Sequence, residues 1–109
     1  MHELAIAESV VDAVLDHTEG RVTCVRLRIG RLSGVVPDAM TFCFDLATAG
    51  TRLEGARLEI DRAAGRAHCR TCETDFGLDD PILLCPCGSA DVEVTEGRSL
   101  KVASVEEVA

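Results

Sequence analysis

Aromatic and basic residues are scarce in this chain of 109 residues. Tryptophan and tyrosine are absent, and the aromatic residues are Phe42, Phe44 and Phe76. Eleven lysines and arginines stand against nineteen aspartates and glutamates, which gives a formal net charge of −8. Proteins that grip single strands stack bases on aromatic rings, and binding to nucleic acid or anionic lipid draws on positive charge. We therefore expect no nucleic-acid partner and no membrane partner.

Long apolar runs and the common catalytic motifs are also missing. No window approaches the roughly 18 apolar residues of a membrane span, and the opening MHELAIAESV lacks the basic and apolar regions of a signal peptide. No glycine-rich phosphate loop is present, and the three histidines are dispersed in sequence, so none can be assigned as the base for a cysteine nucleophile. We expect a cytoplasmic protein that is not an enzyme.

Two amphipathic helices are expected within a single domain. From Leu4 to about Asp16, apolar residues recur at helical spacing and acidic residues occupy the opposite face. Pro37 at a first turn opens a second helix, and Gly50 ends it. The apolar stripe of this second helix and its two flanking residues are Met40, Cys43, Phe44 and Ala47, with Phe42 and Leu46.

Strands are expected where the apolar pattern alternates. Residues 22–29 predict one strand, residues 57–62 a second with Leu58 and Ile60 inward, and residues 99–105 a last strand that returns to the same sheet. In the first strand the inward residues are Thr23, Val25, Leu27 and Ile29, and the outward residues are Cys24, Arg26 and Arg28. The predicted fold is α+β, a small sheet of about three strands packed with two helices. A zinc-binding module at residues 65–96, with a short strand at Val92 and Val94, is inserted into a body of residues 1–64 and 97–109.

Four cysteines of this module form two close pairs, C-x2-C-x12-C-x-C. They are Cys69, Cys72, Cys85 and Cys87. Four thiolates suit a tetrahedral ion, and Zn²⁺ is the usual occupant of such a closed site. The alternatives are incidental buried cysteines, a disulfide, or a site in which His68 replaces one thiolate. The second pair has a single intervening residue, Pro86, where zinc knuckles commonly have two.

The amino terminus offers a second set of candidate metal ligands. The α-amine of Met1, the amide nitrogen of His2 and the His2 imidazole can form fused chelate rings around a square-planar ion such as Ni²⁺ or Cu²⁺. The alternative is that His2 is an ordinary terminal residue. The residues alone do not decide between a metal-binding His2 and an ordinary terminal His2.

Several phrases together resemble one known family. These are the MHE opening, FCFDL at residues 42–46, the paired cysteines, and G-S-x-D-V at residues 88–92. Over nearly its whole length the sequence closely resembles the hydrogenase nickel-insertion accessory proteins, the HypA family. The family commonly has C-P-x-C in the second pair, so this chain departs from it at Cys87.

The resemblance implies a nickel metallochaperone. It implies that His2 binds Ni(II) for transport, near the Met1 amine and Glu3, with Asp38 as a candidate further carboxylate. It implies a separate structural or regulatory Zn(II) on the four cysteines. The implied partners are the maturation GTPase HypB and the large subunit of [NiFe] hydrogenase. The alternative functions are a zinc-stapled adaptor between proteins, without a nickel site of its own, and a small zinc enzyme, which would need an open coordination position.

Overall fold

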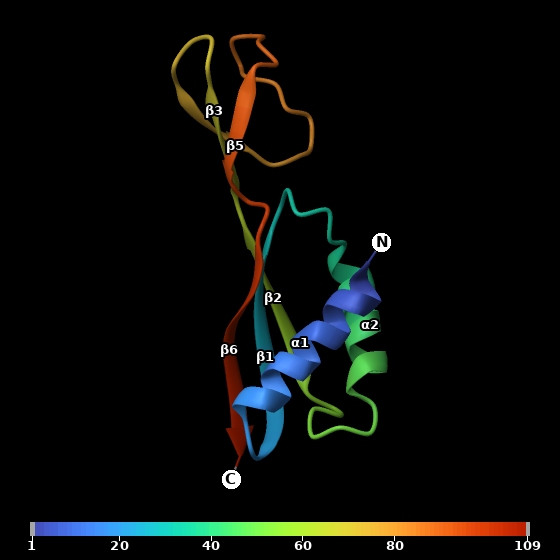
Figure 1. The fold of residues 1–109 in the computed structure, drawn as a ribbon. Coiled ribbons are helices and arrows are strands. Elements are labelled where there is room, and N and C mark those ends of the chain that lie inside the picture. Colours follow the sequence, from blue (N-terminus) through green and yellow to red (C-terminus); the bar gives the residue numbers. More distant parts are fainter. Residues whose placement is uncertain (1, 109) are drawn as a thin grey trace. The chain divides into compact units, whose positions relative to one another are not determined.

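The computed structural model describes residues 2–108, and two helices and two small sheets make up its fold (Figure 1). The elements in chain order are α1 (Glu3–His17), β1 (Arg21–Gly30), α2 (Pro37–Thr48), β2 (Arg57–Ala63), β3 (Gly65–Cys69), β4 (Asp75–Leu78), β5 (Val92–Glu96) and β6 (Leu100–Val108). The sheets have the strand orders β2-β1-β6 and β4-β3-β5. The predicted α+β class is confirmed, including the return of the last strand to the first sheet.

The described residues contain no helix with the length and apolar character needed to cross a membrane. They form two compact units. Among the described residues, the first comprises residues 2–28, 35–61 and 101–108, and the second comprises Ile29–Gly34 and Arg62–Leu100.

The core of the first unit lies where α1 packs against α2. The two helices bury Ala7, Val10, Val11, Val14, Met40 and Phe44. Strand β1 adds Val22, Val25 and Leu27, and the segment between α2 and β2 adds Leu53. Burying an aliphatic or aromatic side chain of this size contributes about 1.5 to 3 kcal/mol. The helical stripes predicted from the sequence are therefore the ones that hold this unit together.

Helix α2 begins and ends at the predicted residues. Pro37 occupies its first turn, and Gly50 follows its C-terminus with φ of 78°, a left-handed conformation that costs glycine little. Cys43 on the predicted stripe is half-buried. The flanking Phe42 and Leu46 point outward, with 66% and 56% of their surfaces exposed.

The predicted alternation of β1 is wrong at two positions. Thr23 is exposed, and its hydroxyl donates to the Glu106 carbonyl over 3.3 Å. Cys24 is buried at 3% exposure, although the pattern placed it on the outer face. Charged groups of Arg57 and Glu59 lie near its thiol, and burial raises the pKa of Cys24. A small side chain on the outer face of a sheet can thus be covered by long neighbours on the adjacent strand.

Arg52 ties the end of α1 to the segment that follows it. Its guanidinium donates to the carbonyls of Leu15, Thr18 and Gly20 at 3.1, 3.0 and 2.6 Å, and to the Thr18 hydroxyl at 3.2 Å. Two of these carbonyls belong to the helix C-terminus, where backbone acceptors lack partners within the helix. One half-buried arginine therefore caps α1.

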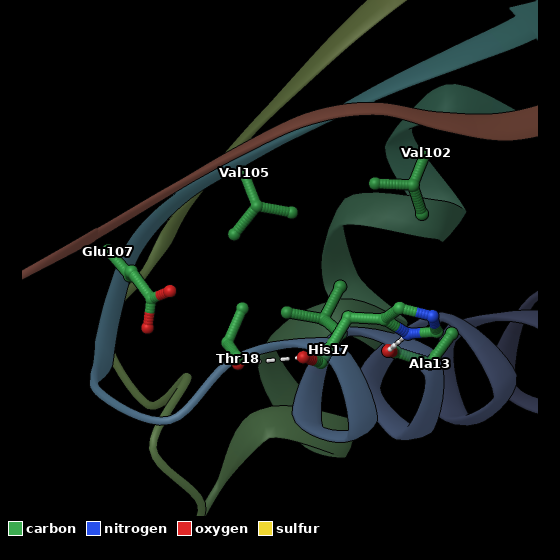
Figure 2. Close-up of a pocket in the computed structure, with 7 residues that line it drawn as sticks. Ala13, His17, Thr18, Val102, Val105 and Glu107 are labelled. Carbon is green, nitrogen blue, oxygen red and sulfur yellow. Dashed lines mark hydrogen bonds between the residues drawn. The ribbon is translucent and has the colours of Figure 1, made fainter.

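An apolar groove of about 440 Å³ lies between the end of α1 and β6 (Figure 2). Its lining residues are Ala13, Val14, His17, Thr18, Val102, Val105 and Glu107. The polar groups of this lining are engaged with backbone. The His17 ring donates to the Ala13 carbonyl, and the Glu107 carboxylate accepts from the Gly20 amide, both over 2.8 Å.

The second unit is built on β3, which pairs antiparallel with both β4 and β5. Strand β5 confirms the predicted strand at Val92 and Val94, whereas β3 and β4 were not predicted. Gly65 and Gly97 pass close to each other in this unit, since a Cβ at Gly97 would meet the Gly65 Cα at 2.6 Å. Gly97 also has φ of 106°. Both the close approach and the backbone conformation require glycine there.

Candidate metal centre

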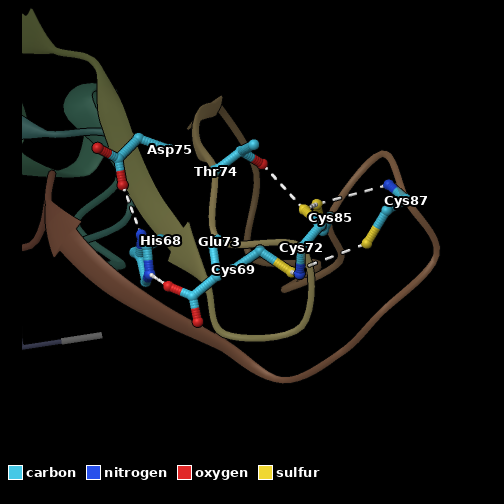
Figure 3. A network of polar contacts seen from close by, with 8 residues as sticks. All are labelled: His68, Cys69, Cys72, Glu73, Thr74, Asp75, Cys85 and Cys87. Atoms are coloured by element: carbon cyan, nitrogen blue, oxygen red, sulfur yellow. Dashed lines mark hydrogen bonds and ion pairs between the residues drawn. The ribbon is translucent and has the colours of Figure 1, made fainter.

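The four cysteines of the two pairs converge at one end of the second unit (Figure 3). Cys69 ends β3, Cys72 lies in the turn before β4, and Cys85 and Cys87 belong to the loop between β4 and β5. The four Sγ atoms all lie within 4.8 Å of one another. Cys69 and Cys85 are buried, and Cys72 and Cys87 are exposed.

The sulfur spacing matches a tetrahedral zinc site. The Sγ atoms of Cys69 and Cys87 are 3.7 Å apart, and those of Cys72 and Cys85 are 3.6 Å apart. Zinc–sulfur bonds of about 2.3 Å give a tetrahedron with edges of about 3.8 Å. The donor set and its dimensions therefore fit Zn²⁺ without a change of fold.

Backbone turns hold the first pair in place. The Cys69 amide donates to the Thr74 carbonyl, and the Glu73 amide donates to the Cys69 carbonyl, both over 2.9 Å. Glu73 has φ of 60°, the left-handed conformation of a tight turn. The Cys72 amide lies 3.5 Å from the Cys69 Sγ and donates to it.

The second pair reaches a similar arrangement with one residue fewer. The Cys87 amide donates to the Cys85 Sγ over 3.4 Å, as the Cys72 amide does toward Cys69. The Gly88 amide donates to the Cys85 carbonyl over 2.8 Å, and Gly88 has φ of 96°. The Cys85 amide donates to the Ser89 carbonyl over 2.9 Å. The shortened gap is thus absorbed by a turn that glycine makes possible.

The pKa values of the two buried thiols of the cluster shift in opposite directions. The Cys72 amide lowers the pKa of Cys69 to about 6. For Cys85 the Cys87 amide acts in the same direction, but burial and the three neighbouring cysteines outweigh it and raise the pKa to about 12. Four thiolates this close repel one another. A divalent cation at the centre removes that conflict, because it favours the ionised form of every ligand.

His68 lies beside the cysteine cluster rather than in it. Its Nδ1 is 2.7 Å from an Asp75 carboxylate oxygen, and its Nε2 is 3.6 Å from a Glu73 carboxylate oxygen. The Asp75 hydrogen bond raises the pKa of His68. Both ring nitrogens of His68 thus face carboxylates. Among the described residues, the ligand atoms that converge are the Sγ atoms of the four cysteines, so His68 is not part of the cluster. Sequence reasoning missed Asp75, since only the strand pairing of β3 with β4 brings it opposite His68.

The amino-terminal candidates lie at the start of α1. His2 is the exposed N-cap residue, and its carbonyl accepts from the Ile6 amide over 3.0 Å. Met1, whose amine belongs to the predicted nickel site, lies outside the described residues. Glu3 is buried at 5% exposure, and its carboxylate accepts from the Val36 amide over 3.1 Å. Asp38, in the first turn of α2, is exposed.

The Glu3 contact joins the beginnings of the two helices. Val36 is the N-cap of α2, so Glu3 satisfies an amide at that end of the helix from 33 positions away. The amide groups at a helix N-terminus lack intrahelical partners and favour negative charge. This role of Glu3 was not foreseen, because it depends on how α1 packs against α2.

Comparison with known proteins identifies the family. The family model described as "Hydrogenase/urease nickel incorporation, metallochaperone, hypA" matches residues 1–107. The chain belongs to the HypA family. It is 47% identical over 108 residues to the hydrogenase maturation factor HypA of Geobacter sulfurreducens, covering 97% of this chain and 98% of that protein. It is 43% identical over 107 residues to HypA of Nostoc sp., covering 97% and 95% of the two chains.

A solved HypA structure has the same fold. The solution structure of the Ni metallochaperone HypA from Helicobacter pylori aligns with a TM-score of 0.71 at 22% identity, covering 100% of this chain and 99% of that one. The resemblance drawn from the sequence is therefore confirmed, and the protein is a member of a family of nickel metallochaperones that serve hydrogenase maturation.

Proposed function

We propose that this chain binds Ni(II) at its amino terminus through His2 and delivers it during maturation of [NiFe] hydrogenase. The observation that carries the proposal is the family match over residues 1–107, which includes the MHE opening. The exposure of His2 at the N-cap of α1 supports it, because an incoming ion can reach the imidazole.

The proposed nickel site suits a carrier. The Met1 amine, the His2 amide nitrogen and the His2 imidazole supply nitrogen ligands, and Glu3 or Asp38 could add an oxygen ligand. The positive end of the α1 macrodipole lies at His2 and opposes cation binding. The acidic residues in the first turns of α1 and α2 offset part of this effect. Because the helix macrodipole weakens cation binding and the acidic residues offset it only in part, the site favours release of the nickel ion.

We further propose that Cys69, Cys72, Cys85 and Cys87 hold Zn(II). The sulfur spacings support this assignment. Four protein thiolates leave no open position for water, so the zinc would be structural or regulatory rather than catalytic. In this proposal residues 65–96 are the inserted zinc-binding module, and residues 1–64 and 97–109 are the nickel-binding body.

The proposed partners are the GTPase HypB and the large subunit of [NiFe] hydrogenase. The proposed compartment is the cytoplasm, where cysteine pairs stay reduced and available to a metal. A net charge of −8 is compatible with protein partners that present basic surfaces.

Equilibrium dialysis against Ni²⁺, with elemental analysis of nickel and zinc, tests both sites together. The native chain and His2→Ala are compared, each with an unmodified amino terminus. His17→Ala is the matched control, since this exposed histidine lies at the other end of α1. We expect zinc near one per chain in all three proteins and nickel lost from His2→Ala alone. Equal nickel uptake by His2→Ala would refute the amino-terminal site and favour the zinc-stapled adaptor.

A further inference from the structure

Three consecutive large aliphatic residues are exposed in the loop between β4 and β5. Ile82, Leu83 and Leu84 have 67%, 37% and 49% of their surfaces exposed. We call Ile82–Leu84 the aliphatic loop. Single exposed apolar residues are ordinary, but a run of three on a protein surface usually marks an interaction site.

Local contacts hold the aliphatic loop in shape. The Ile82 amide donates to the Asp80 carboxylate over 2.9 Å, and the Leu84 amide donates to the Ile82 carbonyl over 3.0 Å. Pro81 fixes one backbone angle before the loop. Cys85, directly after it, belongs to the cysteine cluster. A segment restrained at both ends loses less conformational entropy when a partner binds it.

The stretch of sequence that contains the aliphatic loop carries one sign of charge. Residues 71–97 include no lysine or arginine, and their acidic residues are Glu73, Asp75, Asp79, Asp80, Asp91, Glu93 and Glu96. Arg70, just outside this stretch, pairs with Asp91 and Glu93. Among the ion pairs of the described residues, none includes Asp79 or Asp80, which directly precede the loop.

This charge selects among possible occupants. A second copy of the chain carries the same net charge of −8, and anionic lipid repels the same carboxylates. A protein surface with an apolar pocket edged by lysine and arginine satisfies both the aliphatic side chains and the acidic residues beside them.

We propose that the aliphatic loop inserts into such a pocket on a protein partner, with Asp79 and Asp80 meeting its basic rim. The second unit would then carry a docking element, and the proposed nickel site would belong to the first unit. The choice of partners to test rests on the proposed function.

The test uses the full, zinc-loaded chain and two purified probes, HypB and the large-subunit precursor of [NiFe] hydrogenase. The variant Ile82→Ser/Leu83→Ser/Leu84→Ser removes the aliphatic surface. The matched control, Phe42→Ser/Leu46→Ser, removes exposed apolar surface from α2. A third variant, Asp79→Asn/Asp80→Asn, removes charge and keeps an acceptor for the Ile82 amide. Zinc content and circular dichroism show that each variant is folded, and calorimetric titration gives its affinity.

We expect the triple serine variant to bind one of the two probes at least about tenfold more weakly, with the α2 control close to native. The Asp79→Asn/Asp80→Asn variant should bind that probe more weakly at low salt and show a flatter salt dependence. Native affinity of the triple variant for both probes would overturn the proposal. An equal loss in the α2 control, or a native chain that binds neither probe, would do the same.

Two further measurements separate the other occupants. If sedimentation shows a native dimer that the triple variant abolishes, the occupant is a second copy and the proposal is wrong. If the native chain floats with phosphatidylglycerol vesicles and the triple variant does not, the occupant is a membrane and the proposal is again wrong. Nickel binding by the isolated chain is measured without any partner, so failure of the docking proposal and failure of the nickel site are distinguishable.

Discussion

The Sγ atoms of Cys69 and Cys87 lie 3.7 Å apart, although the two residues are eighteen positions apart in the chain. This contact connects the end of β3 to the loop before β5. Thiols at this distance hold the chain together only weakly by themselves, whereas a shared metal ion makes the contact part of the folding free energy. Folding of the second unit should therefore depend on metal binding by the four cysteines.

Replacing Cys72 with alanine should release zinc and loosen the second unit. The remaining three thiolates cannot complete a tetrahedral site, so amide exchange should quicken across residues 65–90, while α1 and α2 keep their circular dichroism signal. Cys43→Ala is the control, because Cys43 is half-buried on α2 and outside the cluster. Full zinc content and unchanged exchange in Cys72→Ala would contradict a metal-stabilised module.

If the four cysteines hold zinc as proposed, removing it from the native chain with a chelator should reproduce the Cys72→Ala exchange pattern without any substitution. The same amides of the second unit should lose protection, and zinc added back should restore it, because the ligands themselves are intact. Nuclear magnetic resonance measurement of exchange before and after chelation checks this. Loss of protection spread equally over α1 and α2 would show that the metal supports the whole chain.

Glu3→Ala should lower the denaturation midpoint of the first unit. The substitution removes the carboxylate that accepts from the Val36 amide at the start of α2. Glu3→Gln should have a smaller effect, since its side-chain oxygen still accepts but carries no charge. Urea unfolding followed by circular dichroism measures the change. Glu8→Gln, at an exposed position of α1, provides the comparison and should leave the midpoint near native.

Arg52→Ala should reduce the free energy of unfolding by about 2 to 3 kcal/mol, because hydrogen bonds from a charged donor are lost at several carbonyls together. Arg52→Lys should recover little of this loss, as one ammonium cannot reproduce the planar guanidinium contacts. The exposed Arg31→Ala serves as the control. If urea titration gave the same free energy for Arg52→Ala and Arg31→Ala, the capping role of Arg52 would be refuted.

Glu59 should contribute a pH-dependent part of the stability of the first unit. Hydrogen bonds from Arg26 and then Arg57 lower the pKa of Glu59. The folded state thus favours the carboxylate. Its contribution is present above the pKa of the unfolded chain and is lost as the pH falls through the lowered folded value. The stability difference between native and Glu59→Gln should shrink on acidification. Urea midpoints over a pH series measure this difference, and the exposed Glu54→Gln is the reference variant. A stability difference that stayed constant with pH would contradict the prediction.

Much of the fold could be predicted from the chain because its helices and long strands follow regular apolar periods. Strands β3 and β4 could not, since their short sequences mix glycine, cysteine, histidine and aspartate, and their pairing becomes visible only when both are placed side by side. The misplacement of Cys24 has a related cause: alternation assigns a face but not the side chains that cover it from the next strand.

The candidate metal centre was likewise predictable from the sequence only in part. The four cysteines were predicted from their spacing alone, because metal-ligand pairs are local in sequence. The turn at Gly88 that accommodates the shortened pair, and the Glu3 contact across 33 positions, depend on three-dimensional placement. The Arg52 cap has no sequence signal, since a single arginine in a loop is ordinary.

The close passage of Gly65 and Gly97 has a kinetic consequence. Strand β6 pairs with β1, so folding must bring together segments separated by about 70 residues. Once the second unit has formed, the chain from Gly65 to Gly97 returns to its starting point, and the free chain between β1 and β6 is about half as long. Halving a loop lowers its closure cost by about 0.6 kcal/mol, or about threefold in the rate of contact. A metal ion bound by the four cysteines would thus hasten the pairing of β6 with β1.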